Sequence, residues 1–510
     1  MRNTIKQLSR IALGACLLLL VSCDSLDDQF ADLNTDPTQA DQIDPNFKMT
    51  DIQLRISGER YENWRANLIY SSTMMQHIAA LPGYWTGDKY TYNAGYSSSM
   101  WDRYYPNIAR NLEDLLVQTC ANPEDANLCA ITEITRVIMY HRLTDLHGDI
   151  PYSEAGKGFT EGISQPKYDR QQDIYADMLA RLESAAGALN AANPSFGGGD
   201  LIYQGDVDKW KKLANSLMLR LGMRLVKVDP GAAQSWAQKA IAGGMMTSND
   251  DIAMVSHNDP SGWRNGIGEV FEADGNPRLS ATFVDWMAQS NDPRLDIIGL
   301  RAAGADAVGL PNGRTTGATD PVFGIENDPS WVSCDSGADP CGMDVYMRVN
   351  PMITGTTDPM FFMTYAEVEL LTAEAIERGY TSGNAAQHYE NGVRAAMGHL
   401  ALYDANAGIS AADMDAYLAD NPYNGTLEQI NNQIWGATFL NEYESYANWR
   451  RTGFPTLTPI NFPGNESNGQ IPRRLRYPTG ESVANAANYE AAVAAQGPDE
   501  FTTRVWWDAQ

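Results

Sequence analysis

The chain has 510 residues, of which 43% are hydrophobic and 20% are charged, so it has the composition of a globular protein and the length to bury a large core. It carries 64 acidic residues against 37 basic ones, a formal net charge of −27. A surface this acidic repels phosphate backbones and anionic lipid headgroups, which argues against nucleic acid as a partner.

The N-terminus has the pattern of an export signal. Three basic residues precede an apolar run at 11–21. Eleven residues rise about 16 Å as a helix, which is too short for a hydrocarbon core of about 30 Å. The run ends in Leu20-Val21-Ser22-Cys23, which resembles a bacterial lipobox. We therefore predict a lipoprotein signal peptide at 1–22 and lipidation of Cys23. An ordinary signal peptide with an incidental cysteine is the alternative.

Residues 23–45 are polar and rich in aspartate, which is typical of a tether. Asp24, Asp27 and Asp28 follow Cys23, and they resemble the acidic signal that routes Bacteroidetes lipoproteins to the cell surface. The expected localisation is the outer membrane, with the protein held at the cell surface through its lipid anchor only.

Once Cys16 has left with the signal and Cys23 is lipidated, four thiols are left: Cys120, Cys129, Cys334 and Cys341. An even number in an exported protein indicates disulfides, and the sequence separations favour two local pairs among three possible connectivities. A zinc site with four cysteine ligands is the alternative, but neither local pair has the short gap that such sites use.

Helical periodicity dominates at about 100–245 and 360–450. Within these regions, 208–244 and 361–397 each carry two helical patterns joined by a turn, at Asp229-Pro230-Gly231 and Arg378-Gly379-Tyr380. Antiparallel helix pairs of about this length, with small residues where the helices cross, are typical of tetratricopeptide-type hairpins. No strongly alternating strand series is present. We therefore predict a mainly α fold with large ordered loops.

Two stretches break the helical period and are nevertheless rich in aromatic residues. One is about 246–359, where Gly, Pro, Asn and Asp surround scattered Trp, Tyr and Phe residues. The other is Leu81–Trp101, in which six of twenty-one residues are Tyr or Trp. Long irregular segments in a compact domain are usually functional or disordered, and so many aromatic residues argue against disorder.

Four motifs follow one another along the chain: Thr144–Ala155 (TDLHGDIPYSEA), Trp210–Leu225, Tyr365–Ala375, and Glu442–Leu457 followed by Ile471–Pro478 (IPRRLRYP). Together they resemble the SusD/RagB family of nutrient-binding outer-membrane lipoproteins, and Asn448-Trp449 fits its SusD-like 2 branch. The resemblance covers nearly the whole mature chain. It implies a single SusD-like domain at 46–510 with a helical scaffold, a loop-rich ligand region at 246–359 and a C-terminal clamp at 451–510.

The resemblance implies a surface lipoprotein that captures oligosaccharides or polysaccharide segments for glycan uptake. Such proteins sit on a SusC-like TonB-dependent outer-membrane barrel and hand their ligand to it. Some family members, like RagB, capture oligopeptides instead, and this alternative stays open. A scaffold that binds no ligand is a third possibility.

Several motif residues are expected to be structural. Arg450, Arg451, Arg473 and Arg474 are predicted to clamp the C-terminal segment through hydrogen bonds to carboxylates and carbonyls. Glu367 and Glu374 are seven residues apart on one helical face and are predicted to pair with arginines rather than to act in catalysis.

A sugar site needs Trp or Tyr rings for the C–H faces, and polar side chains around them for the hydroxyls. Family resemblance places a stacking Trp in the loop at 81–101 and further aromatic residues in the central region. Trp85 is therefore the first candidate and Tyr84 the second. The other predicted ligand-binding residues are Asp88, Tyr90, Tyr92, Asn93, Tyr96, Trp263, Trp331 and Tyr346.

No catalytic or metal-binding motif stands out. G-x-S-x-G, H-E-x-x-H and the P-loop pattern are absent, and abundant acidic residues alone do not identify a glycosidase pair. We therefore predict no enzyme activity and no cofactor. Asp335, Asp339 and Asp344 offer oxygens for a structural Ca²⁺ ion, although the EF-hand pattern is missing.

Overall fold

The computed structural model describes residues 43–317 and 320–509. The predicted signal peptide, Cys23 and most of the tether lie outside these residues. Residues 45–510 form one compact unit, and all the elements below belong to it.

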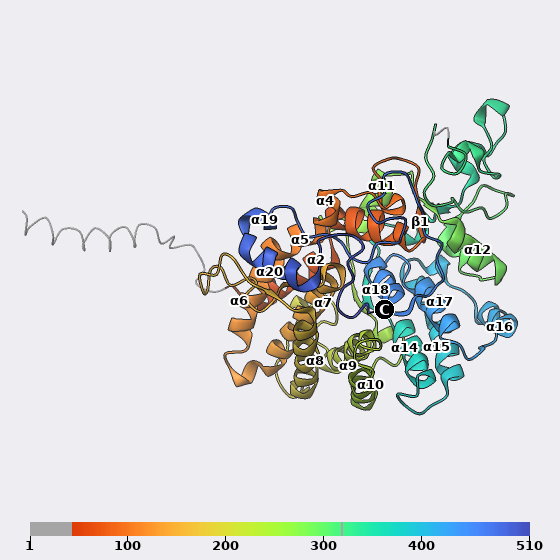
Figure 1. Ribbon diagram of the computed structural model, residues 1–510. Coiled ribbons are helices and arrows are strands. Elements are labelled where there is room, and N and C mark those ends of the chain that lie inside the picture. Colours follow the sequence, from red (N-terminus) through yellow and green to blue (C-terminus); the bar gives the residue numbers. More distant parts are fainter. Residues whose placement is uncertain (1–42, 318–319, 510) are drawn as a thin grey trace, which may run out of the picture. The chain divides into compact units, whose positions relative to one another are not determined.

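Long helices pack as a series of antiparallel pairs. α7 packs against α8, α8 against α9, and α9 against α10, while α14 packs against both α15 and α17. Figure 1 shows α8, α9, α10, α14 and α15 in the lower half of the molecule, away from α4 and α11. Their bounds are α7 (Ala126–His147), α8 (Gln171–Ala188), α9 (Val207–Arg224), α10 (Pro230–Gly243), α14 (Tyr365–Glu377), α15 (Ala385–Gly398), α17 (Leu427–Ala437) and α18 (Glu442–Thr452). This confirms the predicted mainly α, tetratricopeptide-like architecture.

Local chemistry explains the two predicted hairpins. Asp229 caps α10 by accepting a hydrogen bond from the backbone N–H of Ala232, and Pro230 occupies the first helical position. Small residues allow the helices to approach. A Cβ atom at Gly222 would lie 2.8 Å from Cβ of Trp236, and one at Gly392 would lie 2.6 Å from Cγ of Leu370. Larger side chains at these crossings would push the paired helices apart.

The remaining helices are mostly short. Their bounds are α2 (Pro45–Ser57), α3 (Arg60–Glu62), α4 (Ala94–Ser97), α5 (Ser99–Tyr104), α6 (Arg110–Thr119), α11 (Gly266–Ala273), α12 (Ala281–Gln289), α13 (Leu295–Ile298), α16 (Ala411–Asp420), α19 (Glu481–Ala484) and α20 (Ala486–Gln496). A π-helix, Asn63–Ser72, continues α3, and a second one, Tyr105–Ala109, joins α5 to α6. The helix α11 matters most for the site.

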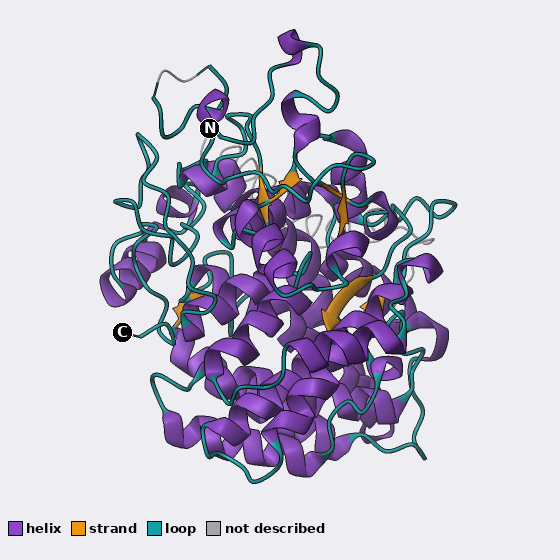
Figure 2. Cartoon of the chain, turned by 90° about the vertical axis from the view of Figure 1, so that its right-hand side faces the viewer, coloured by secondary structure: helices purple, strands orange, loops and turns teal. Residues whose placement is uncertain are grey.

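The strands are two to four residues long and form small sheets among the helices (Figure 2). One four-stranded sheet has the order β1-β5-β7-β6 with antiparallel neighbours, in which Ile78 pairs with Leu279. Two further pairs, β2–β3 and β4–β8, are also antiparallel. The bounds are β1 (Ile78–Ala79), β2 (Ile150–Pro151), β3 (Tyr168–Asp169), β4 (Ala253–Val255), β5 (Arg278–Leu279), β6 (Gly299–Leu300), β7 (Arg348–Val349) and β8 (Met360–Met363).

Buried arginine–carboxylate pairs join the helices. Arg220 of α9 donates two hydrogen bonds to Glu367 of α14, both at 2.6 Å. Arg224 pairs with Glu444 of α18 and lies 3.4 Å from Asp145 of α7. Glu367 therefore pairs with an arginine, as predicted.

The predicted C-terminal clamp is correct for three of its four arginines. Arg450 donates to the backbone carbonyls of Asp145 and Arg473, Arg473 pairs with Asp508, and Arg474 pairs with Asp499. Arg451 differs, because it points to Glu374 of α14 instead of the C-terminal segment. Two consecutive residues in the last turn of α18 therefore have different partners: Arg450 bonds to the C-terminal segment and Arg451 to the hairpin scaffold.

Both local cysteine pairs are disulfides. Cys120–Cys129 ties the end of α6 to the first turns of α7, and Cys334–Cys341 closes a short loop in the central region. Near this loop, Tyr346 and Ile325 belong to a small second hydrophobic cluster that also includes Leu81.

Candidate ligand-binding site

The loop at 81–101 is packed against the rest of the unit rather than open to solvent. The side chain of Trp85 is fully buried, and its indole N–H donates to Oδ2 of Asp274 at 3.0 Å. The expectation that Trp85 presents an open ring face is therefore wrong. A buried Trp N–H needs an acceptor, and Asp274 supplies it from the segment after α11.

Two buried charged residues hold this loop in place through hydrogen bonds. Lys89 is buried, and its Nζ donates to the backbone carbonyls of Ala80 and Trp85 as well as to Asp88. The other carboxylate oxygen of Asp88 accepts from the backbone N–H of Gly313 at 3.0 Å. Asp88 is thus a structural residue in this structure and not an open sugar ligand, contrary to the prediction.

The next predicted residues are divided between packing and partial exposure. Tyr90 is buried and its hydroxyl accepts from the N–H of Ile460. Tyr92 and Tyr96 are half-buried, with guanidinium groups 4.0 and 5.6 Å from their ring centroids. Asn93 caps α4 by accepting from the N–H of Tyr96. Because Tyr90 is buried, it does not offer an open ring to a ligand. The ligand-binding roles of Tyr92, Asn93 and Tyr96 stay predictions.

The predicted ligand-binding residues of the central region also differ in burial. Tyr346 is buried, and its hydroxyl donates to Asp328 at 2.9 Å, so its predicted role as an open ring platform is wrong. Trp331 is half-buried beside the same hydrophobic cluster. Trp263 is half-buried in the loop before α11, where it lines a large open cavity.

This cavity, which we call the Trp263 cavity, has a volume of about 560 Å³. That volume is within the range of small-molecule sites. Its walls come from the end of α2 through the start of the π-helix, from α5 and from the loop leading into α11. The lining residues are Leu54, Ser57, Gly58, Glu59, Arg60, Tyr61, Trp64, Arg65, Arg103, His257, Gly262, Trp263, Arg264 and Glu269.

Arginines lie over the aromatic rings of this cavity. The guanidinium of Arg60 is 4.9 Å from the ring centroid of Trp64. Those of Arg65 and Arg103 are 4.0 and 4.6 Å from that of Tyr61. Such stacking fixes both partners, because the ring quadrupole attracts the cation.

Several buried polar atoms of the cavity have no hydrogen-bond partner within the described residues. They are Nε1 of Trp64, Nε of Arg103 and both ring nitrogens of His257. The side chain of His257 is 8% exposed, and burial lowers its pKa to about 4, so the ring is neutral at pH 7. Buried polar groups are normally satisfied by protein or by ordered water, so these atoms show that the wall of the cavity is polar beneath its surface.

Tyr84 connects this cavity to a second one of about 360 Å³. The ring of Tyr84 makes an edge contact with Trp64, and its hydroxyl donates to Asp274 at 2.7 Å. Asp274 and Phe271 line the second cavity, while Glu269 of the same helix lines the first. Burial and the neighbouring Asp274 raise the pKa of Tyr84 to about 12, so its hydroxyl stays protonated and donates.

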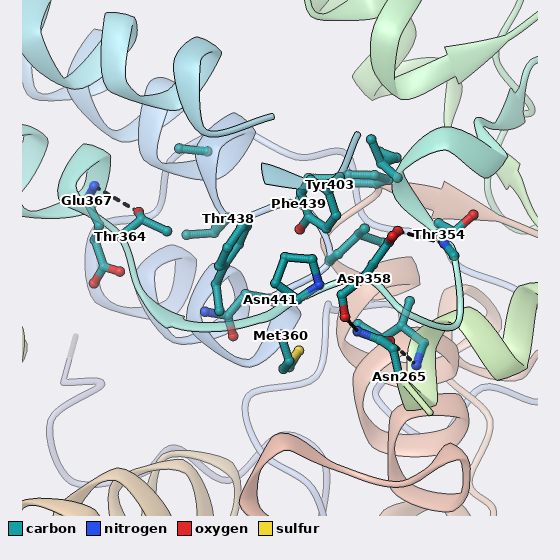
Figure 3. A pocket seen from close by; sticks show the side chains of 17 residues that line it. Asn265, Thr354, Asp358, Met360, Thr364, Glu367, Tyr403, Thr438, Phe439 and Asn441 are labelled. Carbon is teal, nitrogen blue, oxygen red and sulfur yellow. Dashed lines mark hydrogen bonds between the residues drawn. The ribbon is translucent and has the colours of Figure 1, made fainter. Parts of the chain in front are cut away.

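A third cavity is nearly closed. It has a volume of about 20 Å³, enough for one water molecule, and Asn265, Asp358 and Tyr403 line it (Figure 3). Asp358 accepts from the backbone N–H of Gly355 at 2.6 Å, and Asn265 donates to the carbonyl of Asp358. Burial raises the pKa of Asp358 to about 6. The hydrogen bonds around this cavity hold the start of α11 in place. The cavity itself is too small for a sugar.

Sequence reasoning found Trp263 and Tyr84 but missed Tyr61 and Trp64. The signal was present in the run Arg60-Tyr61-Glu62-Asn63-Trp64-Arg65, where arginines flank two aromatic residues. A helical segment presents residues three and four apart on one face, so Tyr61, Trp64 and Arg65 meet at the cavity.

Among the described residues, no group of three or more His, Cys, Asp or Glu side chains is placed to bind a metal ion. Asp335, Asp339 and Asp344 therefore do not form such a group. Between residues 43 and 509, apart from 318 and 319, none of the helices combines the length and apolar character that crossing a bilayer requires.

A family model described as "Starch-binding associating with outer membrane" matches residues 37–478. Among solved structures, one named a chitin-binding protein is 34% identical, covers 92% of this chain and all of that chain, and has a TM-score of 0.82. A Bacteroidetes SusD-like protein, AC2a, is 27% identical with the same coverage and a TM-score of 0.80. A SusD homologue from Bacteroides uniformis, 24% identical over 92% of this chain and all of that one, shares the fold with a TM-score of 0.74. A search of curated proteins gave no match. From its helical hairpins to its C-terminal arginine clamp, the chain belongs to the SusD-like 2 family.

Proposed function

We propose that this protein is a glycan-binding lipoprotein and that the Trp263 cavity holds the sugar. The observation that carries the proposal is an open cavity in which the rings of Tyr61, Trp64 and Trp263 stand beside the guanidinium groups of Arg60 and Arg65. The starch-binding description of the family and the chitin-binding name of the 34% identical relative support a saccharide ligand.

The cavity suits the two kinds of surface that a sugar presents. Aromatic rings accept the C–H faces, and the guanidinium groups of Arg60 and Arg65 and the carboxylate of Glu59 can bond to hydroxyls and ring substituents. Each ring contributes about 0.5–1.5 kcal/mol beyond area burial, so two or three rings support millimolar to micromolar affinity after ordering costs. Such affinity allows capture followed by release.

The wider role follows from the family. We propose that Cys23 carries the lipid anchor, that the protein stands on the cell surface, and that it passes oligosaccharide to a SusC-like TonB-dependent barrel. The hairpin helices, which lie away from α11 in Figure 1, offer the extended surface that docking on a partner requires. The proposed activity is binding without a catalytic step or a cofactor.

Calorimetric titration with chitohexaose, maltohexaose and a mixed peptide digest tests this proposal. Trp64→Ala and Trp263→Ala are expected to weaken glycan binding about tenfold or more, because each removes an aromatic ring that lines the cavity. Trp236→Ala on α10 removes a half-buried indole far from the cavity and is the matched control. Binding of peptides alone would replace the saccharide assignment with the oligopeptide alternative.

A further inference from the structure

The Trp263 cavity has an excess of open donors. Arg60 and Arg65 have no carboxylate within 4.0 Å of their guanidinium groups among the described residues. Arg65 donates a hydrogen bond from Nη1 to the backbone carbonyl of Tyr61 at 2.9 Å, and a guanidinium has five N–H groups.

The two carboxylates that line the cavity, Glu59 and Glu269, are paired with arginines other than Arg60 and Arg65. Arg264 is surrounded by Asp259, Glu269 and Glu272, at 3.1, 3.7 and 2.6 Å. Glu59 is shared between Arg55 and Arg103. The pairing therefore leaves positive charge at Arg60 and Arg65, at the mouth of a cavity on a protein whose net charge is −27.

We propose that the Trp263 cavity selects saccharides that carry negative charge, as carboxylate or sulfate groups, and that Arg60 and Arg65 recognise that charge. This inference rests on the proposed function. A guanidinium fork matches the geometry of both groups, and charge-assisted hydrogen bonds are about twice as strong as neutral ones.

The stacking of these arginines strengthens the argument. Arg60 and Arg65 lie over the rings of Trp64 and Tyr61, so a ligand that binds to these rings lies close to both guanidinium groups. Stacking also holds the planar groups in place, which lowers the entropy lost when an anion binds.

The experiment compares hexamers of matched length by calorimetry: oligogalacturonate for carboxylate, a carrageenan oligosaccharide for sulfate, and chitohexaose and maltohexaose as neutral ligands. At least one acidic ligand is expected to bind about tenfold more tightly than either neutral ligand, with affinity that falls as salt rises. The two acidic arms show which anionic group is preferred.

Arg60→Gln and Arg65→Gln remove the charge and keep a polar side chain, and each is expected to weaken acidic binding about tenfold and neutral binding by much less. Arg301→Gln, at an exposed arginine that pairs with Asp296, is the control and should leave both unchanged. Circular dichroism checks that each variant is folded.

The outcomes separate the two proposals. If neutral hexamers bind as tightly as acidic ones and the two arginine variants change nothing, the charge inference is overturned and the glycan-binding proposal stands. If no hexamer binds, both proposals fail. Binding of poly-glutamate without binding of oligogalacturonate or carrageenan would overturn both in favour of an acidic peptide.

Discussion

Arg451 of α18 and Glu374 of α14 form a bidentate ion pair in which both side chains are completely buried, with N···O distances of 2.5 and 2.6 Å. Asn448 and Asn431 accept further hydrogen bonds from the same guanidinium group. Arg378 approaches Glu374 from the end of α14. The pair thus connects the hairpin scaffold to the helix that also holds the C-terminal clamp.

Removing one partner of this pair is expected to be costly. Glu374→Gln leaves the buried guanidinium of Arg451 without its countercharge, and the free energy of unfolding should fall by about 3–5 kcal/mol. Urea denaturation followed by circular dichroism measures the change. Glu377→Gln, at an exposed position on the same helix, is the control and should change the value by less than about 0.5 kcal/mol. Equal effects of the two substitutions would contradict the importance of the buried pair.

The same pair should make stability depend on pH. The guanidinium groups of Arg451 and Arg378 outweigh burial and lower the pKa of Glu374 from 4.5 to about 2. A carboxyl whose pKa is lower in the folded state stabilises the protein above its unfolded pKa. That stabilisation is lost as pH falls from about 4.5 toward 2. The difference in unfolding free energy between the wild type and Glu374→Gln should therefore narrow over this range.

Asp358 should show the opposite dependence. Its folded pKa is raised from 3.8 to about 6, so its protonated form favours folding, and this contribution is lost as pH rises through about 6. Asp358→Asn resembles the protonated carboxyl and keeps an oxygen for the N–H of Gly355. It is expected to raise the unfolding free energy by about 1–3 kcal/mol at pH 7.5 and by less at pH 4.5. Destabilisation at both pH values would show that Asp358 is needed in its charged form.

Trp85 and the cavity tryptophans should respond differently to substitution. Trp85→Phe removes the buried N–H that bonds to Asp274, so the unfolding free energy should fall by about 1–3 kcal/mol while glycan affinity stays the same. Trp64→Ala and Trp263→Ala should lower affinity with a smaller effect on stability, because both side chains are only half-buried. A large loss of affinity in Trp85→Phe, at unchanged stability, would restore the original sequence prediction.

The disulfide between Cys120 and Cys129 should stabilise the start of α7. It closes a loop of about ten residues, for which chain entropy gives about 2–3 kcal/mol. Replacing both cysteines by serine should lower the unfolding free energy by that amount, as measured by thermal or urea unfolding. Reduction of the wild type that leaves its stability unchanged would contradict this expectation.

The hairpins could be predicted because their signals are local. Asp229-Pro230-Gly231 marks a helix end and the next start, and Gly222 and Gly392 lie where helices cross. The site could not be predicted in the same way. Whether Trp85 is open depends on Asp274, which is 189 residues away along the chain. Trp64, on a helical segment that resembles core, is exposed at a cavity because no neighbouring element covers it fully.

The hydrogen bond between Trp507 and Asp145 joins segments 362 residues apart, within the same cluster as Arg224 and Arg450. Stacked helical repeats usually tolerate being cut into shorter arrays, because each repeat touches only its neighbours. Here α7 and α9 place charges in the interior whose partners come from Glu367 of α14, Glu444 of α18 and the indole of Trp507. A fragment that stopped after α10 would keep the helix packing of a repeat array, but its buried charges would have lost their partners. The helical scaffold therefore cannot be cut into independent repeats, although it looks modular.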